Sequence, residues 1–134
     1  MGAETEMVVT FPGGKKVDSR YKQFTVHTDQ PRDEGGDGSA PEPYDLFLAS
    51  LATCAGVYIL YFCEKRNIAV DGLKMTVRVE KKDKTHLFGA IRMNIRLPAG
   101  FPDKYRSAVV RAAEMCTVKR SLAFPPQFEV KLEE

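Results

Sequence analysis

The chain has 134 residues, of which 43% are hydrophobic and 28% charged, and its formal net charge is +2. This length fits one ordinary domain, which we expect to span residues 1–134, and the apolar content is sufficient for a hydrophobic core. The near balance of 20 basic and 18 acidic residues argues against a dedicated nucleic-acid-binding protein, which usually carries a concentrated basic face. We find no uncharged apolar stretch of about 18 residues and therefore expect no membrane span.

The amino-terminal sequence MGAETEMVV lacks the basic segment and the apolar segment of a secretory signal, so a cytosolic location is expected. Three cysteines are too few for a disulfide scaffold, and none of them forms a CxxC pair. The two histidines, His27 and His86, are far from every cysteine in the sequence and show no ligand spacing. We therefore expect no metal site.

Two strands are predicted near the amino terminus. Residues 6–11 are rich in β-formers and stop at the turn signal PGG. Residues 22–28 alternate in polarity, which is typical of a strand with two different faces. The polar segment 29–43 is rich in glycine and proline and is predicted to be a loop.

A long helix is predicted to follow this loop and to end near Asn67. Ser39 and Glu42 fit a capping box at its start, and a start at Pro43 agrees equally well with the sequence. The helix is apolar nearly all round, which indicates that it is buried in the fold or in an oligomer. Few strands are available to cover it, and a homodimer that packs two such helices together would do so.

Two further strands are predicted at residues 72–82 and 88–97. Each alternates between apolar and charged residues, which indicates one dry and one wet face. The DKTHL segment between them predicts a hairpin.

The rest of the chain predicts an amphipathic helix at 103–115, a short helical turn at 116–122 and a last strand at 127–133. Thr117 or Ser121 is expected to cap the short turn. The resulting order of elements predicts an α+β fold with antiparallel sheet around the long central helix.

Each cysteine could be a packing residue of the core or a reactive thiol. Cys54 and Cys63 are nine residues apart, which places them on opposite sides of one helix, so they cannot pair. A cysteine in an apolar helix is usually inert packing, and this interpretation applies to both. Cys54 lies about three turns into the helix, where the positive helix terminus has little effect. A reactive Cys54 would need a nearby cation or a second polar contact.

The segments GSAPEPYDLFLASLATCAGVYI and AAEMCTVKRSL resemble the paired motifs of the OsmC/Ohr family, the osmotically inducible protein C and organic hydroperoxide resistance proteins. In that family a Pro-acidic-Leu-Leu helix carries the first cysteine, and a second helix ends in a Cys-Pro-Val type motif. The predicted order of elements also matches, so the resemblance covers essentially the whole chain.

The resemblance implies an intertwined homodimer with the long helices at its centre and the active sites at the subunit interface. It implies that Cys54 is the peroxidatic thiol and Cys116 the resolving thiol. The first would attack the O–O bond of an organic or inorganic hydroperoxide and become a sulfenic acid, which the second would convert to a disulfide. A dithiol or lipoyl-type reductant would then restore the thiols, in a cytoplasmic antioxidant stress response. The resemblance implies that no metal or organic cofactor is needed.

The family's peroxidases use an arginine near the amino-terminal strands and a glutamate at the helix start. Arg20 is our preferred counterpart for the arginine, over Lys15 and Lys16. Tyr44 occupies the glutamate position, and Asp45 follows it, as the acidic residue does in the OsmC-like subgroup. Thr117 replaces the usual proline after the second cysteine. These departures favour an OsmC-like member over a dedicated organic hydroperoxide reductase.

Three hypotheses follow. The first is a thiol-dependent hydroperoxide reductase that uses Cys54 and Cys116. The second is an OsmC-like module with little peroxidase activity that binds a small apolar ligand or a partner. The third is a structural dimer whose cysteines are core residues.

Overall fold

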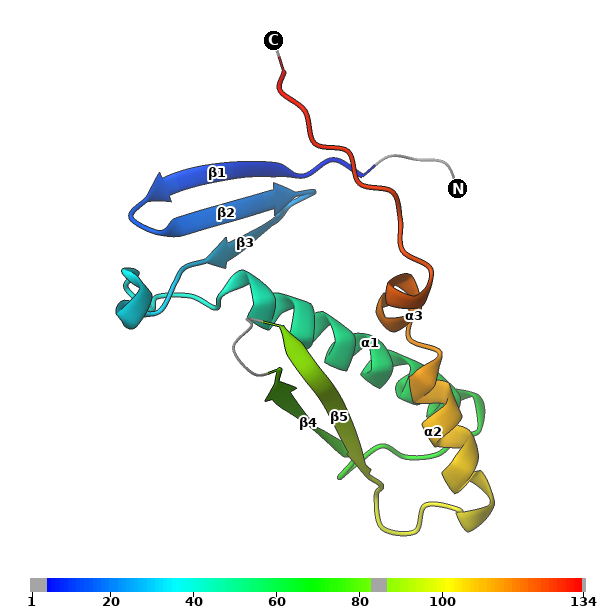
Figure 1. Cartoon of the computed structure of the whole chain (residues 1–134). Coiled ribbons are helices and arrows are strands. Elements are labelled where there is room, and N and C mark those ends of the chain that lie inside the picture. Colours follow the sequence, from blue (N-terminus) through cyan, green and yellow to red (C-terminus); the bar gives the residue numbers. More distant parts are fainter. Residues whose placement is uncertain (1–4, 83–86, 134) are drawn as a thin grey trace. The chain divides into compact units, whose positions relative to one another are not determined.

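A computed structural model of the chain describes residues 5–82 and 87–133. The described chain contains five strands and three α-helices, together with two short 3-10 helices (Figure 1). It divides into two compact units between Ala49 and Ser50, inside helix α1 (Pro43–Lys65). The expectation of one domain stays a prediction, and the antiparallel pairing below agrees with the expected α+β class.

The first unit contains a three-stranded antiparallel sheet in the order β1-β2-β3. Strand β1 is Val8–Gly13, β2 is Lys16–Tyr21 and β3 is Phe24–Thr28. The central strand β2 was not predicted, because Asp, Ser and Lys are poor β-formers and its sequence does not alternate clearly in polarity. Cross-strand pairing on both sides overrides that weak propensity.

Strand β1 continues past the predicted stop at the PGG turn. It includes Pro12, and its pairing register shifts between Thr10 and Gly13. Proline cannot donate to a ladder and is tolerated at edge strands and bulges, and β1 is an edge of this sheet.

The loop before the long helix is organised by the buried side chain of Asp29. Its carboxylate accepts hydrogen bonds from Ser39 Oγ at 2.7 Å and from the backbone N–H groups of Gln30 at 2.8 Å, Ser39 at 3.1 Å and Asp37 at 3.3 Å. The 3-10 helix η1 (Arg32–Glu34) lies within this loop. A Cβ atom on Gly36 would lie 2.0 Å from the carbonyl oxygen of Gln30, so only glycine fits there.

Helix α1 begins at Pro43, the second of the two predicted starts. The capping box at Ser39 is therefore wrong, because the Ser39 hydroxyl is engaged by Asp29. Asp45 instead accepts a hydrogen bond from the backbone N–H of Glu42 at 3.1 Å, which satisfies one of the free donors at the helix start.

At its other end α1 stops at Lys65, close to the predicted end. Asn67 has a left-handed φ of 54°, and the N–H of Ile68 donates to the carbonyl of Cys63 at 2.9 Å. This reversal is the usual way for a helix to satisfy its last carbonyl groups.

Only one stripe of α1 is buried in the chain. Leu51, Ala55, Ile59 and Cys63, spaced four residues apart, are its buried residues. On other faces Leu60 is 36% and Tyr61 51% exposed. The predicted burial on every side is thus not reached within a single chain.

Helix α1 also corrects the statement about membrane spans. Residues 46–63 carry no charge, and α1 is the one helix in the described ranges that is long and apolar enough to cross a membrane. Core helices of soluble proteins often meet the same criterion, and 22% of its apolar window is buried. Length and composition alone therefore assign no membrane to it.

The second unit pairs strand β4 (Lys74–Lys81) with β5 (Phe88–Arg96) in an antiparallel ladder. Both strands were predicted, whereas most of the DKTHL connection falls outside the described residues. The 3-10 helix η2 (Asp103–Tyr105) leads into α2 (Arg106–Glu114), within the predicted helix.

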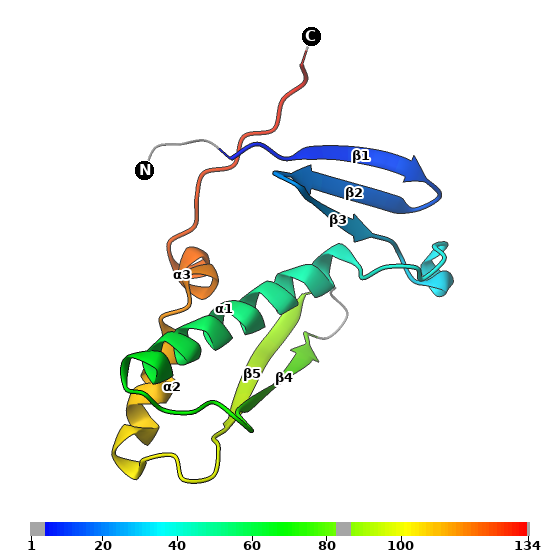
Figure 2. The same cartoon turned by 180° about the vertical axis from the view of Figure 1, so that it is seen from behind.

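The core of this unit lies between α1, α2 and the apolar face of the β4–β5 ladder. Ile59, Cys63, Phe101 and Val109 form its buried cluster. Met75 from β4 and Ile95 from β5 pack against that cluster. Both cartoon views show α2 beside α1 and the two strands (Figure 2).

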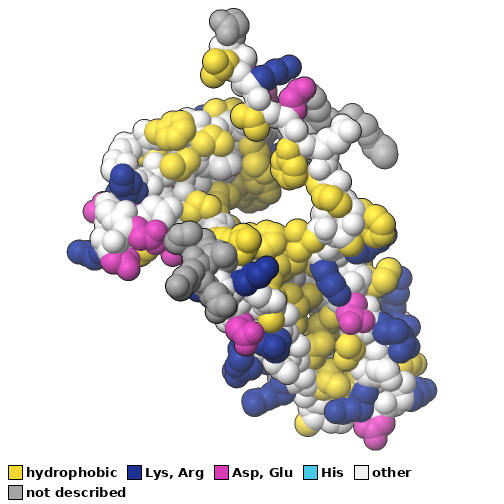
Figure 3. All heavy atoms as spheres, in the orientation of Figure 1, with side chains coloured by type: hydrophobic (Ala, Val, Ile, Leu, Met, Phe, Trp, Pro, Cys, Tyr) yellow, Lys and Arg dark blue, Asp and Glu magenta, His cyan; other side chains and the backbone are white. Residues whose placement is uncertain are grey.

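The last predicted strand, residues 127–133, is not paired. Its apolar side chains are almost fully exposed: Phe128 at 85%, Val130 at 96% and Leu132 at 85%. Figure 3 shows such apolar side chains along the carboxy-terminal segment. A strand requires a neighbouring edge, and this segment pairs with none of the described strands.

Candidate functional site

The structure brings Cys54 and Cys116 together. Cys54 lies on α1 and is half-buried, whereas Cys116 follows α2 and is only 1% exposed. Both thiols are free, and they lie close enough for each to shift the pKa of the other. Cys116 is also the N-cap residue of α3 (Thr117–Ala123). The position of this short helix therefore determines where the Cys116 sulfur lies relative to Cys54.

Hydrogen-bond donors lie close to the Cys54 thiol. The backbone N–H of Val118 contributes most to a lowered pKa of Cys54, and the Cys116 thiol and the N–H of Thr117 add to it. Burial opposes this shift but is the weaker effect. These donors stabilise the thiolate of Cys54, which is the nucleophilic form.

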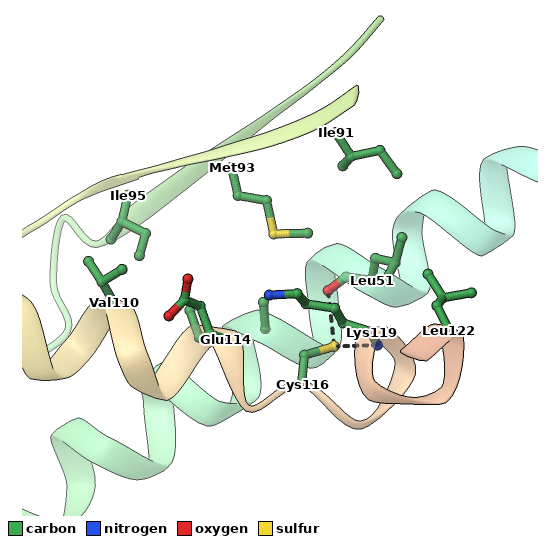
Figure 4. Close-up of a pocket in the computed structure, with 11 residues that line it drawn as sticks. Leu51, Ile91, Met93, Ile95, Val110, Glu114, Cys116, Lys119 and Leu122 are labelled. Carbon is green, nitrogen blue, oxygen red and sulfur yellow. Dashed lines mark hydrogen bonds between the residues drawn. The ribbon is translucent and has the colours of Figure 1, made fainter. Parts of the chain in front are cut away.

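The Cys116 thiol has the opposite tendency. Burial raises its pKa, and the neighbouring Cys54 raises it further because two adjacent thiolates repel each other. Its sulfur accepts a hydrogen bond from the N–H of Lys119 at 3.4 Å and lies 3.8 Å from the carbonyl oxygen of Leu51 (Figure 4). Thr117 and Ser121, the predicted capping residues, do not fill this role, since the Cys116 sulfur caps α3.

The two thiols therefore differ in the sense that a two-cysteine mechanism requires. Cys54 loses its proton more readily, and Cys116 keeps its proton, which it donates to the carbonyl oxygen of Leu51.

The second polar contact that a reactive Cys54 needs is thus supplied by backbone N–H groups in the first turn of α3. These groups could not be assigned from the sequence, because they lie more than 60 residues downstream and depend on how α3 packs. The only available signal was that residues 117–122 follow Cys116 as a short helix.

The other two predicted site residues have local structural partners. Arg20 is exposed on β2, where it pairs in register with Val8 and Thr25. Asp45 caps the first turn of α1 through the N–H of Glu42. Their catalytic roles stay predictions.

Sequence reasoning missed Tyr58. Its hydroxyl is 2.9 Å from Thr117 Oγ1 and ties α1 to the first turn of α3, which supplies the N–H donors to Cys54. Tyr58 follows Cys54 by four residues and so lies on the same helix face, which was the available signal.

Cys63 takes no part in this arrangement. It is fully buried in the cluster with Ile59, Phe101 and Val109, and burial raises its pKa. This placement agrees with its interpretation as an inert core residue.

A pocket of about 310 Å³ adjoins the thiol pair. Its walls are mainly apolar and come from α1, β5, α2 and α3, and Glu114 and Lys119 add charged groups (Figure 4). Cys116 lines this pocket and Cys54 does not. The full set of lining residues is Leu51, Ala55, Ile91, Met93, Ile95, Val110, Ala113, Glu114, Cys116, Lys119 and Leu122.

Comparison with known proteins finds one family model and several similar solved structures. Residues 36–131 match the family model described as OsmC-like protein. No curated protein matches the sequence. Among solved structures, one from Psychrobacter arcticus 273-4, named for osmotic stress induction and detoxification response, has a TM-score of 0.77 and 24% identity over 90% of both chains.

Two others are named for organic hydroperoxide resistance. The protein from Legionella pneumophila has a TM-score of 0.57 and 20% identity, over 91% of this chain and 90% of the other. OhrB of Bacillus subtilis has a TM-score of 0.57 and 17% identity, over 89% of this chain and 90% of the other. At these identities the likeness shows the fold, and it confirms the predicted α+β, OsmC-like class.

Proposed function

The chain belongs to the OsmC-like family, and we propose that it is a thiol-dependent peroxidase that reduces organic, and in part inorganic, hydroperoxides through Cys54 and Cys116. The observation that carries the proposal is the contact between two free thiols whose pKa values move in opposite directions. The names of the similar Legionella and Bacillus proteins, which refer to organic hydroperoxide resistance, support the choice of substrate.

The reaction requires three balanced steps. The Cys54 thiolate attacks the distal peroxide oxygen, the O–O bond breaks, and the alkoxide takes a proton to leave as an alcohol. The Cys116 sulfur then displaces hydroxide from the Cys54 sulfenic acid, giving a disulfide and water. A dithiol finally reduces the disulfide and becomes oxidised itself.

The test is peroxide consumption in the presence of a dithiol. We expect Cys54→Ser to abolish consumption, because no thiolate remains to attack, and Cys63→Ser to leave it intact. Mass spectrometry of the wild-type protein after mild peroxide treatment should show the loss of two protons, located at Cys54 and Cys116. Turnover by the Cys54→Ser protein, or unreactive cysteines in the wild type, would contradict the proposal.

The proposed active form is a homodimer. The exposed faces of α1 and the exposed Phe128, Val130 and Leu132 leave apolar surface that a second copy would cover. Light scattering after size-exclusion chromatography tests this, and a monomer at micromolar concentration would contradict it. A cytosolic location is part of the proposal, because a reducing compartment keeps both cysteines available as thiols.

The alternative is a ligand-binding module with little peroxidase activity. The apolar pocket beside Cys116 is the observation that favours it. A small apolar ligand that copurifies with a protein inert toward hydrogen peroxide, tert-butyl, cumene and fatty-acid hydroperoxides would support this alternative.

A further inference from the structure

The charge of the chain is unevenly distributed along the sequence. Residues 1–49 contain five basic and nine acidic residues, whereas residues 50–134 contain 15 basic and nine acidic residues. The near balance over the whole chain, from which no dedicated nucleic-acid binding was expected, therefore conceals a net charge of +6 in the second unit. The basic residues of the β4–β5 ladder include Lys74, Arg78, Arg92 and Arg96.

These four side chains share one face of the ladder. Residues two apart along a strand, and residues directly opposite each other on paired strands, point to the same side of a sheet. The register pairs Lys74 with Arg96, Thr76 with Asn94, Arg78 with Arg92 and Glu80 with Ala90. We call the surface formed by these eight residues the outer face.

The outer face points away from the thiols. The intervening residues of the same strands are apolar. Met75 and Ile95 pack against the buried cluster, and Ile91 lines the pocket beside Cys116. In Figure 1 the ladder lies in front of α1, and in the reverse view of Figure 2 α1 lies in front of the ladder, so this helix covers one side only. Figure 3 shows lysine and arginine side chains over the uncovered side.

The outer face carries more positive charge than its own carboxylate neutralises. Arg92 forms an ion pair with Glu80 at 3.4 Å, and Glu80 is the one acidic residue of the face. Within the described ranges Lys74, Arg78 and Arg96 have no acidic partner. The register also places two like-charged pairs directly opposite each other, which is destabilising. All four basic residues are exposed, and a bound polyanion would relieve their repulsion.

From this arrangement we propose that the outer face binds double-stranded DNA, independently of its sequence, across the major groove. The two like-charged pairs are four residues apart along the strands, a separation of about 13 Å. The major groove of B-form DNA is about 12 Å wide. One pair can therefore contact each of the two phosphate backbones that border the groove, with Thr76 and Asn94 above the base edges between them. This binding is separate from the proposed peroxidase activity.

The chemistry of the outer face favours a DNA duplex over other polyanions. Three of its four cations are arginines, whose guanidinium groups bind phosphate through two parallel hydrogen bonds. An anionic lipid surface would need only the cations, whereas a duplex also offers partners to the side chains of Thr76 and Asn94. The eight residues include no aromatic ring on which the bases of a single strand would stack. The major groove of A-form RNA is too narrow for side chains to enter.

Four phosphate contacts predict weak and salt-dependent binding. Each neutralised phosphate contributes about −0.9 to the slope of the logarithm of the binding constant against the logarithm of the salt concentration. We therefore expect a slope of about −3 to −4 for the wild-type protein. Dissociation constants of sequence-independent complexes are about 1–100 µM at physiological salt, and lower salt tightens them.

The test follows the fluorescence anisotropy of a labelled DNA duplex of about 20 base pairs, in titrations with the protein from about 50 mM salt upward. Arg78→Thr removes one cation from the outer face, and threonine is a good β-former. Arg111→Thr is the matched control, because it removes the same charge from an exposed position on α2. We expect Arg78→Thr to weaken binding by about fivefold or more relative to the control and to reduce the slope by about 0.9.

Two measurements separate binding from folding. Arg78→Thr also removes one like-charged pair, so its melting temperature should equal or exceed that of the wild type. Glu80→Gln releases Arg92 from its ion pair and should tighten duplex binding by about twofold or more. A variant that binds more tightly cannot be explained by loss of structure. Weaker or unchanged binding by Glu80→Gln would contradict the assignment of Arg92 to the binding surface.

The proposal would be overturned by a duplex that does not bind at about 50 mM salt. Equal weakening by Arg78→Thr and Arg111→Thr would overturn it as well, because only the total charge would then matter. Tighter binding of a single strand of the same length would assign the face to another polyanion, and so would binding of phosphatidylglycerol vesicles with which the duplex does not compete. None of these measurements uses a peroxide or a dithiol, so their failure is distinguishable from a failure of the proposed function.

Discussion

Replacing Cys63 by serine tests whether this residue packs in the hydrophobic core or takes part in the reaction. Cys63 is fully buried among Ile59, Phe101 and Val109, and burial raises the pKa of its thiol. A hydroxyl without a partner in such a cluster costs about 1–3 kcal/mol. The preceding helical turn offers a carbonyl that serine can reach, so we expect the lower part of that range, about 1–2 kcal/mol.

A loss of this size lowers the melting temperature of a chain of 134 residues by about 3–10 °C. Thermal unfolding, followed by circular dichroism with reductant present and at fixed protein concentration, measures it. Peroxide consumption at a temperature well below unfolding should equal that of the wild type. A wild-type melting temperature would refute the burial argument, and lost activity in a folded protein would show that Cys63 serves the reaction.

Three further predictions concern the thiols and the loop before α1. Tyr58→Phe removes the hydrogen bond to Thr117 and should lower the free energy of unfolding by only about 0.5–1.5 kcal/mol, measured by urea denaturation. Alkylation of Cys54 should also require a higher pH in Tyr58→Phe than in the control Tyr61→Phe, whose side chain is exposed. Equal pH profiles in the two variants would contradict this prediction. The alkylation rate of Cys54 should reach its plateau at a lower pH than that of a free thiol, and Cys116→Ala should shift the profile upward, because one donor to the thiolate is lost; an unshifted profile would show that Cys116 does not contribute. Asp29→Asn should destabilise the protein most at neutral pH. Hydrogen bonds, chiefly that from the Ser39 hydroxyl, lower the pKa of Asp29 in the folded protein. The stabilisation by the Asp29 carboxylate is therefore present above the ordinary aspartate pKa and is lost as the pH falls below it. Urea denaturation at pH 7 and pH 3 checks this, and a difference independent of pH would count against the reasoning.

The elements with strong periodicity were predictable from the sequence. Strands β4 and β5 alternate clearly and pair with each other, so local pattern and local contact agree. Two of the wrong predictions concern segments whose structure depends on their neighbours. The polar β2 forms because two strands flank it, whereas residues 127–133 alternate in polarity but pair with none of the described strands.

The thiol pair was predictable only through the resemblance of two motifs, because no periodicity relates Cys54 to Cys116. The pocket and the placement of the N–H donors from α3 depend on tertiary packing, and the sequence signalled only that a short helix follows Cys116. For Asp45 the sequence signal has two explanations. An acidic residue at a helix start caps the helix, as Asp45 does, whether or not it also takes part in a reaction.

The meeting of two sulfurs from distant parts of the chain also has a mechanical consequence. A disulfide bond between residues 54 and 116 would close a loop of about 60 residues. It would reduce the entropy of the unfolded chain and so raise the free energy of unfolding by about 4 kcal/mol. The oxidised form should therefore resist heat better than the reduced form. Each turnover would raise the free energy of unfolding when the disulfide forms and lower it again when the disulfide is reduced. A melting curve would therefore report the redox state directly.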